Sequence, residues 1–596
     1  MKRKYLPYLY TRITDGFWAD KQKLIREVTL DAVYDRFYET GRIGAFEMNY
    51  KEGEPNRPHY FWDSDVAKWM ESVAYLTAKE RMPEEEERVD RLVDLIESGR
   101  LDNGYFNIYF EQLAPDMIFK DRDCHELYCA GHLLEAAVEY YKATGKDKFL
   151  RLMKDYMRHI KQVFVLDDSA AFSSSGHEEI ELALIKLYDL TGEREWLDLS
   201  LHFVNMRGCG TKPGKDSAHS DYNQDHLPVR GQFTAEGHAV RACYLYCAMA
   251  DLALRCGDVE LKTACQKLFD NMIRRKMYIT GGIGSTADGE RFEDDFVLPN
   301  DTAYAETCAA LSLALFSRRM SLLEPDAKYA DTAERVIYNG FLSGLSLDGR
   351  SFFYENAQEI NLKEQKKHEG VHYPITERVE IFGCSCCPPN ITRFIPSVAD
   401  FLYTYSCDKY NEIKVVYVNQ YMNCISRFDG FEITQKTNYP FDGKISITAT
   451  KDLLLALRIP GWCDEYRIRV NGKRVTANNE KGYAMIISEA DDVIELDLLI
   501  KPKLNYADPR VEADKGLSAV SYGPFIMCAE SVDNPYLNES VIIDGKMQIV
   551  PGKFGLPAVT VPATPQPLYM IPYHAFANRG ECDMKIWIKY DIKKPI

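Results

Sequence analysis

The sequence predicts a chain of mixed class, with an N-terminal (α/α)6 barrel over residues 1–410 followed by β-sandwich domains over 411–510 and 511–596. Three observations predict this fold class. A helical pattern recurs up to about residue 405, polar and apolar residues alternate after residue 410, and 596 residues with 46% hydrophobic content provide apolar side chains for several cores. The division near residue 510 is the least marked, since it depends only on Pro509 and Gly516.

The helical part repeats a unit of two helices. In each clear case an amphipathic helix ends at a glycine, and a short loop leads to a second helix. The units open at Asp63, His125, His177, His238, Glu306 and Cys386, and successive starts lie 52 to 80 residues apart. Long periods of this kind are typical of stacked helical hairpins, and six hairpins close an (α/α)6 barrel.

The repeat also predicts which side chains meet. Equivalent positions in a closed ring of hairpins face the same end of the barrel, so the polar residues at the unit starts should converge there. Helix N-termini at that end favour anions, because their backbone N–H groups lack partners within the helix. We therefore expect His125, His177 and His238 to share one mouth with carboxylates and thiols, although a buried histidine is often only a hydrogen-bonded core residue.

The strands are predicted from polar and apolar residues that alternate with a period of two. The alternation is clearest in residues 412–418 and 444–450, and residues 467–475 read as a hairpin with an Asn471-Gly472 turn. Residues 495–498, 519–522 and 585–590 continue the pattern. Short alternating strands of this kind indicate β-sandwich domains.

Composition excludes several classes of function. A net charge of −17 and a pI near 5.3 argue against nucleic acid and anionic membranes as partners, because both require a basic surface. The sequence has no apolar run of the length that spans a bilayer and no signal-peptide pattern, so a cytoplasmic location is expected. The sixteen cysteines are thinly spread, and we interpret most as buried thiols in a reducing compartment.

Four residues offer a set of zinc ligands: Glu306, Cys308, Cys386 and Cys387. Adjacent thiols cannot form an ordinary unstrained disulfide, whereas a cation can bind both as thiolates. Residues i and i+2 diverge by about 200° on a helix, so Glu306 and Cys308 could share a metal only at a terminal or irregular turn. The alternative is that these cysteines are only buried structural residues. Cys384 is an additional nearby thiol that leaves the choice of ligands open. The donor types favour zinc but do not exclude iron.

The motifs of the helical part resemble those of glycoside hydrolase family 127, the zinc-dependent β-L-arabinofuranosidases. The matching segments are residues 280–285, 289–290, 298–302, 306–309, 334–340 and 382–390. No segment of the strand-rich tail is diagnostic, but the order of a helical barrel followed by β-sandwiches is similar to that of the family.

The resemblance implies a retaining exo-hydrolase that releases terminal β-L-arabinofuranose, or a closely similar furanose, from small plant-derived saccharides. It implies that Cys386 is the nucleophile and Glu290 the acid/base, and that Glu306, Cys308, Cys386 and Cys387 bind Zn²⁺. It also implies that His125, His177, His238 and Tyr354 contact the sugar. Without the resemblance, the acidic residues around Glu290 would indicate only a solvated loop.

Two other functions remain open from the sequence. One is another (α/α)6 sugar enzyme, either an epimerase or a hydrolase that uses only carboxylates, with structural zinc. The other is a carbohydrate-binding protein without activity. The sequence does not decide which furanose is bound or the oligomeric state, although strand-rich tails often form homodimer surfaces.

Overall fold

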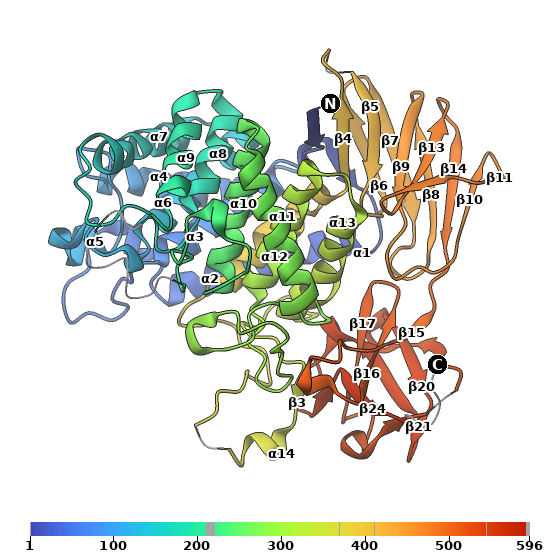
Figure 1. The fold of residues 1–596 in the computed structure, drawn as a ribbon. Coiled ribbons are helices and arrows are strands. Elements are labelled where there is room, and N and C mark those ends of the chain that lie inside the picture. The colour runs from blue at the N-terminus through green and yellow to red at the C-terminus, as the bar shows by residue number, and fades with distance from the viewer. Residues whose placement is uncertain are drawn as a thin grey trace. The chain divides into compact units, whose positions relative to one another are not determined.

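The computed structural model describes residues 2–209, 212, 221–368, 370–410, 412–543 and 545–591. The chain forms two compact units, which we describe separately (Figure 1). The helical unit comprises Lys23–Asn271 and Glu380–Ser397. The strand-rich unit comprises Met1–Gln22, Met272–Val379 and Val398–Ile596. Among the described residues, no helix has the length and apolar content needed to cross a membrane.

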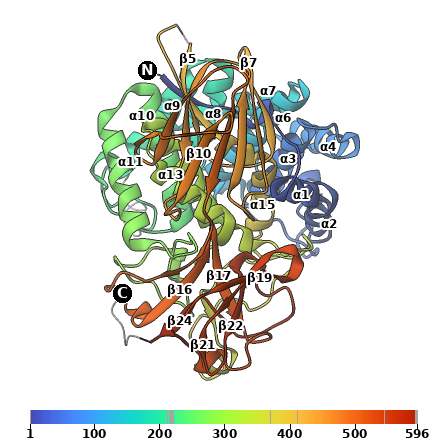
Figure 2. The same cartoon turned by 90° about the vertical axis from the view of Figure 1, so that its right-hand side faces the viewer.

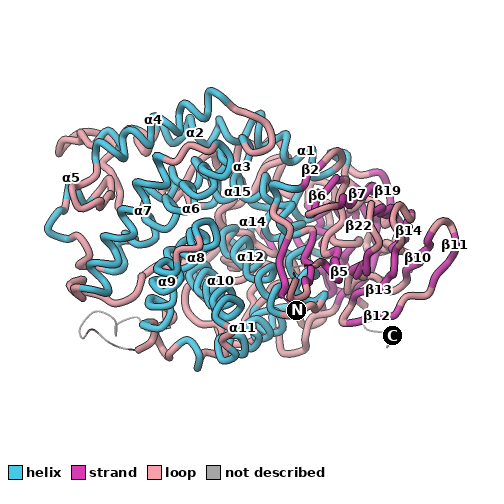
Figure 3. Tube along the Cα trace, turned by 90° about the horizontal axis from the view of Figure 1, so that it is seen from above, coloured by secondary structure: helices cyan, strands magenta, loops and turns pink. Residues whose placement is uncertain are grey.

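The helical unit is built from paired helices. Its first group packs side by side in the order α15 (Cys387–Ser397), α3 (Trp62–Thr77), α6 (Glu126–Thr144), α8 (Ile180–Thr191) and α10 (Ala239–Cys256). Partners of these helices are α4 (Pro83–Gly99), α7 (Lys148–Lys161), α9 (Arg194–Met206) and α11 (Val259–Asn271). The unit also contains α2 (Leu30–Glu39) and the short α5 (Phe110–Leu113), whereas α1 (Phe17–Leu24) crosses from one unit to the other. Figure 3 shows these helices in cyan.

The helix ends have local causes in the sequence. Helices α6, α8 and α10 end at Gly145, Gly192 and Gly257, which adopt left-handed backbone conformations with φ of 74°, 71° and 68°. Glycine has no Cβ to oppose this conformation, and its N–H caps a carbonyl of the last turn. The prediction of helices that end at these glycines is confirmed.

The strand-rich unit carries the sheets (Figure 2). One sheet has the order β1 (Lys2–Tyr5), β4 (Tyr403–Cys407), β5 (Ile413–Val418), β9 (Leu453–Arg458), β13 (Tyr483–Ser488) and β12 (Asn478–Glu480). A second has the order β11 (Lys473–Val475), β10 (Tyr466–Val470), β14 (Val493–Leu498), β8 (Lys444–Ala449), β7 (Phe431–Thr437), β6 (Cys424–Phe428) and β2 (Thr11–Ile13). These two sheets face each other, because Gln435 Nε2 on β7 donates a hydrogen bond to Tyr403 Oη on β4 at 2.7 Å.

A third sheet contains the C-terminal strands. Its main path is β19 (Gln548–Pro551), β20 (Pro557–Val561), β22 (Leu568–Pro572), β17 (Phe525–Glu530), β16 (Leu517–Tyr522), β24 (Trp587–Tyr590), β18 (Val541–Ile542) and β21 (Ala563–Thr564). Beside this path lie β15 (Pro502–Asn505), β23 (Met584–Lys585) and β3 (Glu359–Ile360). The helices of this unit are α12 (Thr307–Leu323), α13 (Ala327–Arg335) and α14 (Leu362–Gln365).

The structure differs from the sequence prediction at two places. Only helices were expected before residue 405, but β3 pairs with β23 there, and the N-terminal strands β1 and β2 pair with β4 and β6. These N-terminal edge strands are too short to show alternation, and their partners lie about 400 residues away in sequence, so no local pattern reveals them. The sequence placed the boundary between the two β-sandwich domains at residue 510. The C-terminal sheet begins earlier, because β15 (Pro502–Asn505) already pairs with β16.

Candidate active site

The predicted site residues of the helical unit gather at the starts of consecutive helices. His125 is the residue before α6, and His238 is the residue before α10. His177 lies in the segment before α8, with its ring centroid 5.6 Å from that of His125 and 5.6 Å from that of His238. The repeat therefore identified three histidines that form one continuous group.

Backbone contacts fix which ring nitrogen of each histidine carries the proton. Nδ1 of His125 lies 2.7 Å from the carbonyl oxygen of Asp123, and Nδ1 of His177 lies 3.2 Å from that of Glu178. A carbonyl only accepts, so both Nδ1 atoms donate and each Nε2 remains an acceptor. His238 is the reverse case, since its Nδ1 accepts from the Val240 N–H at 3.2 Å and its Nε2 therefore carries the proton.

His125 and His177 are uncharged at neutral pH. Burial, helped by the positive charge of Arg241, lowers the pKa of His125 to about 3. The same two causes lower the pKa of His177 well below its usual value. Neutral imidazoles with fixed tautomers can donate to and accept from hydroxyl groups, which suits an uncharged sugar.

The vicinal cysteines also belong to the helical unit. Cys387 opens α15, Cys386 immediately precedes it, and the Cys386 carbonyl accepts from the Asn390 N–H at 3.3 Å. Cys387 is buried, Cys386 is half-buried, and neither is in a disulfide. Their Sγ atoms lie 3.8 Å apart. The nearby Cys384 is exposed.

The other predicted metal ligands lie at the start of α12 in the strand-rich unit. Glu306 is the residue before this helix, with φ −58° and ψ 139°, and Cys308 is in its first turn. Both side chains are buried. The terminal turn that the sequence required for these two residues is therefore present. The Thr307 N–H donates to the Tyr354 carbonyl at 2.9 Å, so the segment that carries Tyr354 is joined to the same helix start.

Glu290 lies in a short turn of the strand-rich unit, Asp288–Glu290, where Gly289 adopts φ 69°. Its carboxylate accepts a hydrogen bond from the phenol of Tyr304. Burial raises the pKa of Tyr304 well above its usual value, and the charges of Glu306, Glu290 and Glu355 add to the effect. Tyr304 therefore keeps its proton and acts as a donor to Glu290 at any ordinary pH.

Sequence reasoning did not find Tyr304 or the pair Glu355–His372. The ring of Tyr304 lies 6.1 Å from that of Tyr354 and 6.4 Å from that of His372. His372 Nε2 is 2.7 Å from a carboxylate oxygen of Glu355, and burial raises the pKa of Glu355. The available signals were the position of Tyr304 two residues before Glu306 and that of Glu355 next to Tyr354.

Sequence models of one family match almost the whole chain. The model described as the β-L-arabinofuranosidase GH127 catalytic domain matches residues 11–400. The models of the GH127 middle domain and of the family 127 C-terminal domain match residues 415–500 and 502–589.

Individual relatives agree with the family match. The chain is 36% identical over 508 residues to a non-reducing end β-L-arabinofuranosidase of Bifidobacterium longum subsp. longum, covering 80% of this chain and 76% of that protein. A GH127 β-L-arabinofuranosidase of Geobacillus stearothermophilus T6 has a TM-score of 0.91 at 37% identity, covering 98% of this chain and 100% of that one. A second solved GH127 β-arabinofuranosidase has a TM-score of 0.89 at 32% identity, covering 99% of this chain and 98% of that one. The resemblance inferred from the motifs is thus confirmed, and the chain belongs to glycoside hydrolase family 127.

Proposed function

We propose that this glycoside hydrolase releases terminal β-L-arabinofuranose, or a closely similar furanose, from plant-derived saccharides with retention of configuration. Two named relatives above are β-L-arabinofuranosidases, and this supports the choice of sugar. The observation that carries the mechanism is the pair of vicinal thiols at the start of α15, since Cys386 is half-buried beside the fully buried Cys387.

The four proposed ligands, Glu306, Cys308, Cys386 and Cys387, are a donor set able to hold a metal ion. Thiolates favour zinc over magnesium or calcium. Two sulfurs bound to one tetrahedral zinc at about 2.3 Å lie roughly 3.8 Å apart, and the Sγ atoms of Cys386 and Cys387 are separated by 3.8 Å. When bound, zinc would keep these sulfurs as thiolates and weaken the bond that a sulfur forms to carbon.

The reaction proceeds in two displacements at the anomeric carbon. First, Glu290 gives its proton to the glycosidic oxygen as the Cys386 sulfur attacks C1, and the aglycone leaves as an alcohol. Glu290 then takes a proton from water, which attacks C1 and releases the Cys386 sulfur. Two inversions give net retention. Tyr304 holds the Glu290 carboxyl through its hydrogen bond and so orients the proton that is transferred.

The histidine group and Tyr354 are proposed to bind the sugar. His125 and His177 offer Nε2 acceptors, and His238 offers an Nε2–H donor. This combination can bind neighbouring hydroxyl groups of a furanose without any charge. Tyr354 supplies an aromatic hydroxyl from the segment that is hydrogen-bonded to the start of α12.

The test is hydrolysis of an aryl β-L-arabinofuranoside by the wild type and by Cys386→Ser, with the first product anomer identified by NMR. We expect the wild type to release the β-anomer and Cys386→Ser to lose at least 10³-fold in kcat. The matched control is Cys384→Ser, which removes an exposed thiol two residues away and should retain full activity. Substantial activity in Cys386→Ser, or an intermediate esterified to a carboxylate, would overturn the mechanism.

Three further expectations remain proposals. The helical part is proposed to close as an (α/α)6 barrel, because helices start where each predicted repeat opens. A cytoplasmic location suits a thiol-rich protein. Homodimer formation through the strand-rich part is testable by light scattering.

A further inference from the structure

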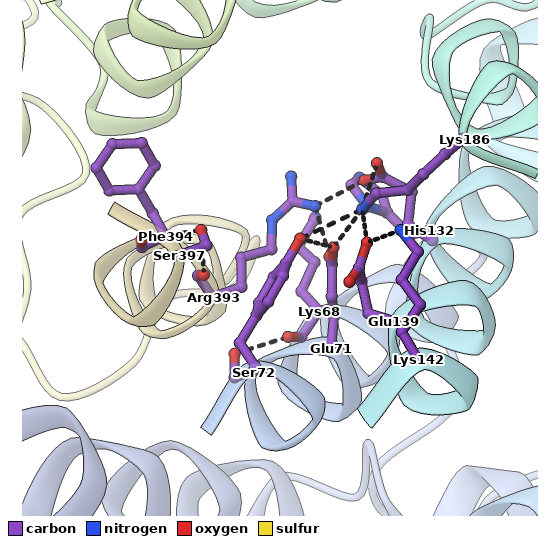
Figure 4. Close-up of polar contacts among 12 residues, drawn as sticks. Lys68, Glu71, Ser72, His132, Glu139, Lys142, Lys186, Arg393, Phe394 and Ser397 are labelled. Atoms are coloured by element: carbon purple, nitrogen blue, oxygen red, sulfur yellow. Dashed lines mark hydrogen bonds and ion pairs between the residues drawn. The ribbon is translucent and has the colours of Figure 1, made fainter. Parts of the chain in front are cut away.

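Further along the same helices than the histidine group, the interior of the helical unit contains a layer of four charged side chains and one tyrosine. We call it the ionic layer, and it consists of Glu71, Glu135, Lys186, Tyr244 and Arg393. Figure 4 shows Lys186 and Arg393 reaching toward Glu71 from different helices. Glu71, Glu135, Tyr244 and Arg393 are buried, and Lys186 is partly buried.

Arg393 joins α15 to three other helices. Its Nη1 donates to Glu71 Oε2 on α3 at 2.7 Å and to Glu135 Oε2 on α6 at 2.8 Å. Its Nη2 donates to Tyr244 Oη on α10 at 3.0 Å, and its Nε donates to Asn390 Oδ1 on its own helix at 2.7 Å. A planar guanidinium can make these bonds together because its N–H groups point in fixed directions.

Lys186, which lies on α8, links this helix to the ionic layer. Its Nζ lies 2.9 Å from Glu71 Oε1 and 3.1 Å from Glu135 Oε1. Glu139 Oε1 also lies 3.2 Å from Lys186 Nζ and 3.0 Å from Lys142 Nζ, so the three carboxylates are balanced by three cations. Every oxygen of Glu71 and Glu135 is bound by a cation.

Four of the five helices joined by this layer start at or just after a predicted site residue of the helical unit, and the fifth is α3. Helices α6, α8, α10 and α15 follow His125, His177, His238 and Cys386. Each member of the layer lies five to nine residues inside its helix, which is about 8 to 14 Å along the axis. A change of rotation in one of these helices would therefore break the layer and also move a site residue.

A second set of contacts links the layer to the histidines. Ligand atoms of Glu179, Glu135 and His132 lie within 4.8 Å of one another, and Glu179 Oε1 is 3.1 Å from His132 Nδ1. The Tyr128 ring packs between His132, at 4.5 Å, and His177, at 4.1 Å.

His132, Glu135 and Glu179 also form a group of metal-ligand type. We do not assign a metal to it, for two reasons. Glu135 already accepts from Lys186 and Arg393. Burial and the charge of Glu135 raise the pKa of Glu179 well above its usual value, which disfavours the carboxylate form that a metal needs.

We propose that the ionic layer is a positioning device, in which Arg393 fixes the rotation and depth of α15 and thereby places Cys386 and Cys387 relative to the histidine group. Buried ion pairs often contribute little net stability compared with apolar packing, but they penalise any arrangement that separates the charges. Arg393 is a positioning residue here, because it acts through its helix rather than on the substrate. The inference rests on the proposed function only for its effect on turnover.

The test compares Arg393→Lys with a matched buried arginine of the strand-rich unit. Arg458 is fully buried and bridges Asp331, at 2.7 Å, and Glu334. Arg458→Lys therefore removes a comparable buried guanidinium, whose carboxylate partners Asp331 and Glu334 lie on α13, a helix without a predicted site residue. Both variants keep the positive charge, and both should lower the melting temperature by similar amounts.

The two variants should differ in turnover and in thiol reactivity. With an aryl β-L-arabinofuranoside, Arg393→Lys should lose at least tenfold in kcat with KM changed less than threefold, whereas Arg458→Lys keeps kcat within twofold. In metal-free protein, the rates at which iodoacetamide alkylates Cys386 and Cys387 should change at least threefold only in Arg393→Lys. Peptide mass spectrometry resolves each cysteine, and the exposed Cys384 is the internal reference.

The outcomes separate the two proposals. If the wild type has no activity on furanosides, the proposed function is wrong. The alkylation rates of Cys386 and Cys387 still test whether Arg393 positions α15. Unchanged kcat and alkylation in Arg393→Lys, or equal losses in Arg458→Lys, overturn the positioning role. If Arg393→Lys does not fold, Tyr244→Phe, which removes the 3.0 Å bond to Arg393 and keeps the ring, decides in its place, with an expected twofold to fivefold loss of kcat.

Discussion

The helical unit and the strand-rich unit carry different kinds of predicted site residue. The helical unit has three imidazoles and two thiols, all at or near the starts of helices that pack side by side. The strand-rich unit has Glu290 and Tyr354 on loop segments, Glu306 before α12 and Cys308 in the first turn of that helix, and the structure adds Tyr304.

The difference lies in the chemistry that each environment permits. Imidazoles whose tautomers are fixed by the backbone are suited to binding neutral hydroxyl groups, and helix starts favour anionic sulfur. Carboxylates close to a buried phenol are suited to holding and moving a proton. We propose that nucleophilic attack and the imidazole contacts to the sugar belong to the helical unit. Proton transfer and the Tyr354 contact belong to the strand-rich unit, and each prediction below tests part of this division.

Metal binding should depend equally on both units. Cys308→Ser changes the strand-rich unit and Cys387→Ser changes the helical unit, and each should lower the zinc content from about one equivalent to almost none, because a closed site needs all four ligands. Elemental analysis of the purified proteins measures this, and nearly all activity should be lost with the metal. Cys384→Ser is the control and should keep its zinc. Full zinc content in either ligand variant would remove that residue from the proposed site.

Proton transfer should depend on the strand-rich unit alone. Glu290→Gln is expected to lower kcat/KM, which reports the first displacement, on an alkyl arabinofuranoside by about 10²- to 10⁴-fold, the usual contribution of general acid catalysis. The loss should shrink on a dinitrophenyl glycoside, whose leaving group needs little protonation. Steady-state kinetics on both substrates measure this, with Asp288→Asn as the control because Asp288 lies in the same turn but is exposed. Equal losses on the two substrates would contradict the assignment of Glu290 as the acid.

Sugar binding should depend on the helical unit. His125→Gln is expected to raise KM by roughly five- to tenfold, the worth of about one hydrogen bond of 1 kcal/mol, with kcat nearly unchanged. His202→Gln on α9 is the control, since His202 lies outside the histidine group. A change confined to kcat would instead place His125 in the chemical step.

The smallest expected effect is on the pH dependence of stability. The pKa of His125 falls from 6.5 to about 3 on folding, so between these values the unfolded chain binds a proton that the folded chain does not. Stability is then intact above pH 6.5 and is lost progressively as the pH falls toward 3. Between pH 7 and pH 4 the melting temperature of His125→Gln should fall less than that of the wild type, by on the order of a few °C. Parallel curves in differential scanning fluorimetry would show that His125 is not buried in its neutral form.

Much of the fold was predictable because its signals are local. The glycines that end α6, α8 and α10 mark positions where only a left-handed residue fits, and the Asn471-Gly472 turn joins β10 to β11 in register. The motif resemblance identified the family and thereby Glu290, which no local pattern separates from a solvated acidic loop.

By itself, the sequence determined where helices start and end, which strands alternate, and which reactive side chains stand at repeated positions, because 3.6-residue and two-residue periods are properties of neighbouring residues. Only the tertiary structure decided the pairing of β1 with β4, the bond from Tyr304 to Glu290 and the ionic layer. Arg393 reaches Glu71 across 322 positions of sequence. The physical reason is that a buried charge is tolerated only where packed helices bring its partners to it, and that meeting is a property of the folded chain.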